Sequence, residues 1–227
     1  KITPAQRVSE VKEYYFSKKL REVAQLNAEG KDIVSLGIGG PDRPPHKDVI
    51  DTLCTEAAKP GNHSYQPYVG IPELREAFAA WYKKHYDVDL DPKSEIQPLI
   101  GSKEGILHIS LAFLNPGDGV LIPNPGYPTH TSVSRLAGAE VFNYNLTEEN
   151  GWEPDFAELE KLPLERIKFM WVNYPHMPTG KSASMELYKR IVDFGRKHGI
   201  VIVNDNPYSF ILNDNPISML KVEGAKD

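Results

Sequence analysis

The 227-residue sequence has one cysteine, no uninterrupted block of basic residues and no apolar run long enough to cross a membrane. The single Cys54 excludes a disulfide framework and a Cys-x-x-Cys metal site, and it agrees with a reducing cytoplasm. The sequence has 26 Lys and Arg residues and 31 Asp and Glu residues, which gives a net charge of −5. This negative charge argues against binding to a nucleic acid or to an anionic membrane surface. An anionic metabolite would have to be bound by a local group of residues.

The remaining composition, 40% hydrophobic and 25% charged, is typical of a globular chain. This length suits one large α/β domain or one and a half average domains. The start of the sequence has no apolar signal-peptide core. It begins with Lys1 and not with Met, so we expect a polypeptide trimmed from a longer one. We expect Cys54 to pack within a helix interface.

Helical and strand patterns alternate along nearly the whole chain, which predicts an α/β fold with a mostly parallel sheet between helices. Short apolar runs predict strands at residues 33–36, 96–100, 120–122, 141–144, 168–172 and 200–204. Helices are predicted at residues 47–58, 72–84, 103–114, 128–137, 155–161 and 185–198. They follow an N-terminal amphipathic helix that has Thr3 as its N-cap and Pro4 at its first position and ends before Gly30.

The loops after the strands are the places to search for a ligand site, because open α/β sheets bind ligands beyond the carboxyl ends of their strands. Residues 101–105 (GSKEG) join a strand to a helix, and a helix start with small residues presents N–H groups that attract phosphate. A plain helix N-terminus is the alternative. A P-loop pattern is absent, and Pro41 after the glycines at 37–40 excludes a dinucleotide-binding helix there.

Two further strands end in unusual loops. Residues 173–180 (NYPHMPTG) form a rigid turn that can hold polar groups against a planar ligand or be purely structural. Residues 205–208 (DNPY) place Asp205 directly beyond a buried strand, where a carboxylate needs a cation or a hydrogen-bond donor, unless it caps a helix. The histidines have no metal-ligand spacing, so we predict packing or surface positions and no metal site for His63, His108, His130 and His198.

Together these motifs resemble the class I/II pyridoxal-phosphate aminotransferases of fold type I. The motifs occur in the same order as in that family: YQPYVGIPELR at 65–75, GSKEG, NPGYP at 124–128, NYPHMPTG and DNPY. Within the family, the sequence most resembles the branch that contains the aspartate and LL-diaminopimelate aminotransferases. The resemblance implies a three-layer large domain cut off before its last strands and its C-terminal small domain. Residues 1–45 would form an N-terminal helix and substrate-side segment, and residues 46–227 part of the large cofactor-binding domain.

The resemblance also implies roles for individual residues. Ser102, Lys103 and the backbone N–H of Glu104 would hold the cofactor phosphate, in agreement with the helix-start argument. Tyr65 would reach that phosphate from the neighbouring subunit, which implies a homodimer. Tyr127 would stack on the pyridine ring.

At the other side of the ring, Asp205 would pair with the protonated ring nitrogen and make the ring an electron sink. Tyr208 would donate a hydrogen bond to the phenolic oxygen. The substrate side would include Tyr14, Tyr15, Ile38 and Gly39.

The sequence departs from the family pattern at Met177, where members usually have Asn before the Pro-Thr-Gly turn. A thioether cannot donate a hydrogen bond, so Tyr208 alone would support the phenolic oxygen unless Asn173 or His176 reaches it. We therefore expect a shifted pKa at the cofactor.

The second departure is that no catalytic residue lies in this chain, because the family's Schiff-base lysine is expected beyond Asp227. Lys221 and Lys226 are predicted to be solvated surface lysines. We predict an aminotransferase that acts on an α-amino acid and a 2-oxo acid, and a 227-residue chain that is inactive alone. Another fold-type-I enzyme, such as a C–S β-lyase or a decarboxylase, and a non-catalytic homologue without the lysine are the alternatives.

Overall fold

The structure is a computed structural model that describes residues 2–9, 13–37 and 39–227. The chain divides into two compact units, one formed by Lys1–Ser9 with Tyr68–Asp227 and the other by Glu10–Pro67. This division falls after Pro67, and the boundary expected after residue 45 stays a prediction.

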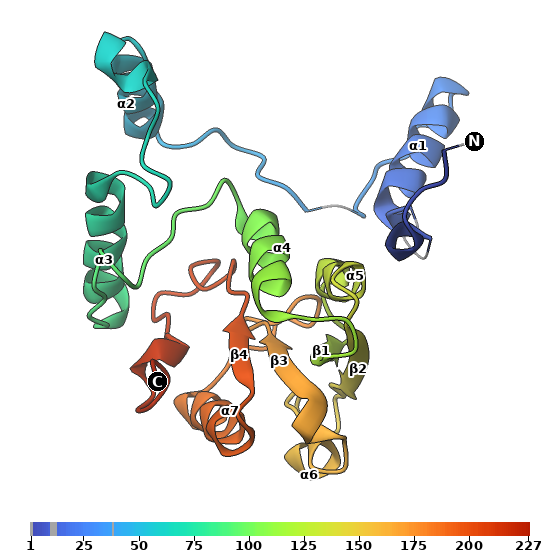
Figure 1. Cartoon of the computed structure of the whole chain (residues 1–227). Helices are drawn as coiled ribbons and strands as arrows, with labels where there is room; N and C mark the ends of the chain where they lie inside the picture. Colours follow the sequence, from blue (N-terminus) through green and yellow to red (C-terminus); the bar gives the residue numbers. More distant parts are fainter. Residues whose placement is uncertain (1, 10–12, 38) are drawn as a thin grey trace. The chain divides into compact units, whose positions relative to one another are not determined.

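The larger unit contains a parallel four-stranded sheet (Figure 1). Its strands are β1 (Gly119–Asn124), β2 (Glu140–Asn145), β3 (Ile167–Val172) and β4 (Val201–Asn204), in the order β2-β1-β3-β4. Four of the six predicted strands are therefore confirmed. The fully buried runs of β1 and β3 explain why they read as continuous apolar segments, as strands covered on both faces do.

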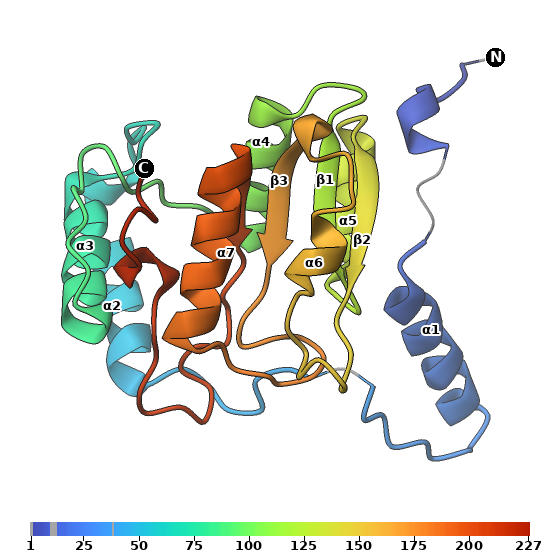
Figure 2. The ribbon, with the colours of Figure 1, turned by 90° about the horizontal axis from the view of Figure 1, so that it is seen from below.

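Helices cover both faces of this sheet, which gives the predicted three layers (Figure 2). One face carries α4 (Ser102–Phe113) and α5 (Pro128–Leu136), and the other carries α6 (Phe156–Leu159) and α7 (Met185–His198). Alternate residues of a strand point to opposite faces. Accordingly, Phe169 and Trp171 belong to the core under α4 and α5, whereas Met170 and Val172 belong to the core under α7.

The helix ends follow local sequence signals. The Ser184 side chain accepts a hydrogen bond from Leu187 N at 3.0 Å and caps α7, which ends at Gly199 in a left-handed conformation. The larger unit also contains α3 (Pro72–Tyr86) and the short helices η1 (Gln6–Val8), η3 (Leu164–Arg166) and η4 (Met219–Lys221). The smaller unit contains α1 (Tyr15–Ala28), α2 (Lys47–Ala57) and η2 (Pro60–His63).

Three predictions about the N-terminal third are wrong. Thr3 caps no helix, because η1 begins at Gln6 with Ala5 as its N-cap and α1 begins at Tyr15. Val8 is 39% exposed, so the early turns have little packing to stabilise them. Residues 33–36 form no strand, since Leu36 is 93% exposed and the Ile33 backbone is bound by the Asn27 side chain. Cys54 is exposed on α2 and does not pack in an interface.

The predicted strand at residues 96–100 is also absent. This segment has no hydrogen-bonded neighbour among the described strands, and Ile100 is 99% exposed. Instead, Ile100 N donates to Glu104 Oε2 at 2.7 Å, so the segment ends as the entry to α4. An apolar run becomes a strand only where a partner strand accepts its backbone groups.

Candidate active site

The carboxyl ends of β1, β3 and β4 lie at the same edge of the parallel sheet (Figure 1). The NPGYP motif at residues 124–128 begins at the end of β1, and the loops at residues 173–180 and 205–208 follow β3 and β4 there. These three loops of the larger unit therefore lie at one edge of the sheet, where ligands of such sheets bind.

A continuous series of side-chain contacts crosses this edge. The Lys103 Nζ lies 5.9 Å from the centre of the Tyr127 ring, within the range of a cation–π contact. The Tyr127 ring meets the His130 ring edge-on at 5.5 Å, and His130 Nε2 lies 3.0 Å from Asp205 Oδ2. We call these four residues the Lys103–Asp205 series. It connects the start of α4, through the start of α5, to the end of β4.

Asp205 is held by a residue whose role the sequence analysis missed. The His130 side chain is fully buried, and its ring stacks on Trp171 with centroids 4.5 Å apart and planes inclined by 11°. Because a carboxylate only accepts, Nε2 of His130 carries the hydrogen. Of the two positions predicted for His130, core packing or surface, the structure shows core packing, and the bond to Asp205 was not foreseen. A polar residue on the buried face of an amphipathic helix was the available signal.

Asn173 holds the backbone of the same loops. Its Nδ2 donates to Asp205 O at 2.6 Å, and its Oδ1 accepts from Met177 N at 2.8 Å. Asn173 is 3% exposed, so both ends of its amide are satisfied inside the protein. The structure thus gives Asn173 a role in fixing the 173–180 and 205–208 loops.

His176 is likewise engaged within the chain. Its Nδ1 lies 2.8 Å from Thr179 Oγ1 and its Nε2 lies 3.1 Å from Pro125 O. Burial lowers the pKa of His176, while the bond to Pro125 opposes that effect. Neither Asn173 nor His176 is therefore without a partner, and Met177 between these loops is half-buried.

At the start of α4, Ser102 and Lys103 are exposed. Glu104 uses its side chain to accept from Ile100 N, and its backbone N–H donates to Gly101 O at 3.2 Å. The backbone N–H of Glu104 would have to exchange that partner to bind a phosphate. Ser102 and Lys103 are better placed for this role.

The other predicted site residues are not brought into this series. Tyr208 is 40% exposed in the loop after β4. Tyr14, Tyr15, Gly39 and Tyr65 belong to the smaller unit, where the Tyr65 side chain is fully exposed. Ile38 lies outside the described residues.

Lys221 and Lys226 lie on the surface, as predicted. Lys221 Nζ is 3.2 Å from Asp87 Oδ2, and Lys226 Nζ is 2.7 Å from Glu95 Oε1. Both lysines stabilise the docking of the last residues against the segment after α3. Among the described residues, no group of three or more His, Cys, Asp or Glu side chains could hold a metal ion, and no helix is long and apolar enough to span a membrane.

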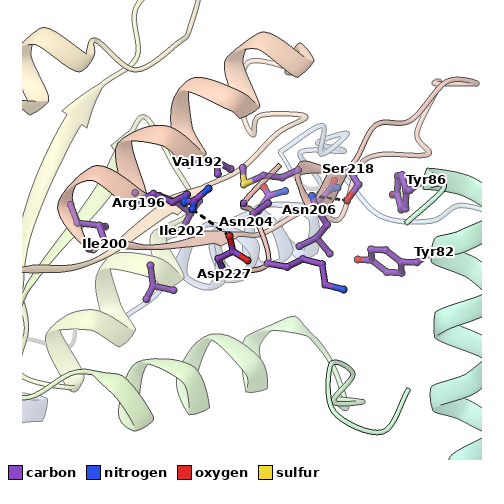
Figure 3. A pocket seen from close by; sticks show the side chains of 18 residues that line it. Tyr82, Tyr86, Val192, Arg196, Ile200, Ile202, Asn204, Asn206, Ser218 and Asp227 are labelled. Atoms are coloured by element: carbon purple, nitrogen blue, oxygen red, sulfur yellow. Dashed lines mark hydrogen bonds and ion pairs between the residues drawn. The ribbon is translucent and has the colours of Figure 1, made fainter. Parts of the chain in front are cut away.

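A cavity of about 710 Å³ lies along the outer side of β4 (Figure 3). Its walls include Tyr82 and Tyr86 of α3, Asn204 of β4 and Arg196 of α7, and an ion pair of 3.4 Å between Arg196 and Asp227 closes part of it. Because neighbouring residues of an extended chain alternate in direction, Asn204 faces this side while Asp205 reaches His130 on the other. This cavity is separate from the Lys103–Asp205 series.

Comparison with known proteins places this geometry in a family. The family model described as aminotransferase class I and II matches residues 31–225. The chain belongs to this family. The resemblance that the sequence motifs indicate is therefore confirmed, and so is the fold class that it implies.

Among the family's members, LL-diaminopimelate aminotransferase of Dehalococcoides mccartyi is 41% identical over 225 residues, which cover 98% of this chain and 58% of that protein. The enzyme of the same name from Aquifex aeolicus is 41% identical over 216 residues. This chain thus spans less than two thirds of the length of these relatives.

Solved structures agree with this assignment. Apo-BacF from Bacillus subtilis has a TM-score of 0.91 and 35% identity, covering 100% of this chain and 58% of that one. An aspartate aminotransferase mutant of Thermus thermophilus has a TM-score of 0.85 and 26% identity, covering 92% of this chain and 54% of that one.

Proposed function

We propose that this chain forms the cofactor-binding part of a pyridoxal-phosphate-dependent aminotransferase, which moves an amino group from an α-amino acid to a 2-oxo acid. The observation that carries this proposal is the Lys103–Asp205 series. It places a cation at a helix N-terminus at one end and a nearly buried carboxylate at the other. A planar ligand with an anionic group at one end and a protonated ring nitrogen at the other matches both ends.

The residues at this edge fit pyridoxal phosphate. Ser102 and Lys103, at the start of the 12-residue α4, would hold its phosphate, aided by the helix dipole. The half-buried Tyr127 would contact its ring, and the Asp205 side chain, only 11% exposed, would meet the ring nitrogen. When bound, the cofactor supplies an electron sink beside the substrate α-carbon.

Asp205 would keep a proton on that ring nitrogen, which requires its carboxylate to stay charged and correctly oriented. The hydrogen bond from His130 serves the second need, because it fixes the position of Oδ2. Asn173 fixes the backbone of the same residue from the opposite loop. Tyr208 would donate to the phenolic oxygen of the cofactor.

The remaining assignments belong to the same proposal. Tyr65 would reach the phosphate from a second copy in a homodimer, in the cytoplasm. On the substrate side we propose Tyr14, Tyr15, Ile38 and Gly39. The names of the 41%-identical relatives make LL-diaminopimelate the first amino donor to test.

The experiment uses the intact protein with pyridoxal phosphate, a panel of ¹⁵N-labelled amino acids that includes LL-diaminopimelate, and 2-oxoglutarate as acceptor. We expect the label to appear in the product amino acid. Asp205→Asn keeps the side-chain shape but removes the charge, and should lower the rate about 100-fold or more. Asp193→Asn, which removes only a surface ion pair with Lys189, is the matched control. Release of ammonia without label transfer would contradict the proposal.

A further inference from the structure

The His176 side chain stands in the middle of a directional chain of hydrogen bonds. Lys181 N donates to Thr179 Oγ1 at 3.3 Å, Thr179 Oγ1 lies 2.8 Å from His176 Nδ1, and His176 Nε2 lies 3.1 Å from Pro125 O. A backbone carbonyl only accepts, so Nε2 carries the hydrogen. In the neutral ring Nδ1 then accepts from the Thr179 hydroxyl. The carbonyl of Pro125 therefore sets the direction of every hydrogen bond in this series.

This arrangement favours one state of the ring. A second proton on Nδ1 would point at the Thr179 hydroxyl oxygen, which already accepts a hydrogen bond from Lys181 N. The Thr179 hydroxyl would then also lose Nδ1 as the acceptor for its own hydrogen. His176 is also only 2% exposed, so water cannot compensate a charge. The geometry and the burial agree on a neutral imidazole with the hydrogen on Nε2.

The bond to Pro125 joins two loops of the candidate site. Pro125 lies between the end of β1 and Tyr127, which is the N-cap of α5. His176 belongs to the loop after β3, and that loop is closed on itself by backbone bonds from His176 N to Lys181 O at 2.8 Å and from Gly180 N to His176 O at 2.7 Å. The imidazole thus reaches from a rigid loop to the backbone two residues before Tyr127.

We propose that His176 is a positioning residue, which holds Tyr127 in place at the start of α5 through the carbonyl of Pro125. Both ring nitrogens of His176 are engaged by groups of the protein itself. Its effect on a cofactor would pass through Tyr127, so this consequence rests on the proposed function. The link between His176 and Tyr127 rests on the hydrogen bonds alone.

Two variants distinguish the two hydrogen bonds that the imidazole makes. A glutamine side chain places its amide nitrogen near the position of Nε2, so His176→Gln keeps the donor to Pro125 and gives up the acceptor for Thr179. An asparagine places its amide oxygen near the position of Nδ1, so His176→Asn keeps the acceptor and gives up the donor. Both remove the aromatic ring. A purely structural role of the ring would therefore make the two variants similar.

The first measurement uses the cofactor-free intact protein. Two-bond ¹H–¹⁵N spectra of the histidine rings, assigned by the signal lost in His176→Gln, should give the neutral pattern with the hydrogen on Nε2. The ring signals of Tyr127, assigned with Tyr127→Phe, should move in His176→Asn and stay near the wild-type position in His176→Gln. A hydrogen on Nδ1, or equal movement in both variants, would overturn the proposal.

The second measurement is the dissociation constant of pyridoxal phosphate. We expect it to rise about tenfold in His176→Asn and to stay within about threefold in His176→Gln, as the loss of one buried hydrogen bond predicts. His198→Gln, on α7 away from this edge, is the control and should match the wild type. If the wild type binds no pyridoxal phosphate, the proposed function fails, and the Tyr127 spectra still decide the role of His176.

Discussion

His130 Nε2 donates to Asp205 Oδ2 across 3.0 Å and ties together two segments that are 75 residues apart in the sequence. The face of the histidine ring stacks on Trp171, so the orientation of the ring is fixed before any ligand binds. A carboxylate beyond a buried strand is costly unless it has a donor. His130 provides that donor, and it leaves Asp205 with a small exposed surface for a ligand.

This pair predicts a measurable coupling energy. His130→Phe keeps the stacking on Trp171 but leaves the Asp205 carboxylate without its donor, which should cost about 1–3 kcal/mol of unfolding free energy. Asp205→Ala and the double variant complete a double-mutant cycle in urea. We expect the double variant to be more stable than the sum of the single effects predicts. Strict additivity would mean that the pair contributes nothing to stability.

The turn that carries Tyr127 should not tolerate a side chain at Gly126. A Cβ there would overlap the backbone carbonyl oxygen of Pro123, so the turn itself would have to shift. We expect Gly126→Ala to cost about 1–3 kcal/mol in a thermal or urea unfolding experiment. Gly61→Ala is the matched control, because a Cβ at Gly61 meets no atom within 4 Å. Equal stability of both variants would show that the turn relaxes freely.

Tyr188 should make the protein less stable at alkaline pH. Burial raises the pKa of Tyr188 to about 12 from its ordinary 10.0, and its hydroxyl donates to Tyr174 O at 3.3 Å. The unfolded chain therefore loses the proton first, and the stability falls as the pH rises from 10 towards 12. Between pH 9 and 11, the unfolding free energy of Tyr188→Phe should fall by about 1 kcal/mol less than that of the wild type.

Urea midpoints of both proteins across this range are the measurement. Tyr68→Phe, which changes a fully exposed tyrosine, should follow the wild-type curve. A Tyr188→Phe curve with the wild-type slope would contradict the prediction.

Met177 should affect the titration of a bound cofactor in the intact protein. Both Asn173 and His176 are engaged with other groups, so neither replaces the missing amide donor. Met177→Asn would add a donor that stabilises a negative charge on the phenolic oxygen. We expect the pH midpoint of the visible absorption band to fall by about one unit. An unchanged midpoint would contradict this, and Met185→Asn on α7 serves as the control for a surface change.

The centre of the sheet could be predicted from the sequence because its two inner strands, β1 and β3, are buried on both faces. Runs such as Phe169–Val172 in β3 have no polar position at all, and they could be recognised by apolar character alone. The runs at residues 33–36 and 96–100 look similar in sequence but have no partner strand among the described residues. Apolar character indicates that a segment can be buried, and it does not indicate what covers it.

The candidate site was predictable only in part. Asp205 and the 101–105 loop stand out because their residue types are unusual after a strand. The bond from His130, and the roles of Asn173 and His176 in joining loops, depend on contacts between segments 32 to 75 residues apart. Such contacts follow from the order of the strands, which local sequence patterns do not contain.

The outer edge of β4 has a consequence for handling these 227 residues as an isolated polypeptide. Among the described strands β4 pairs with β3 alone, its sequence Val-Ile-Val has no charge or proline to discourage another strand, and Val201 is 46% exposed. We expect such an edge to pair with the same edge of another copy in solution. Light scattering that grows with concentration, and that Val201→Lys suppresses, would reveal this self-association.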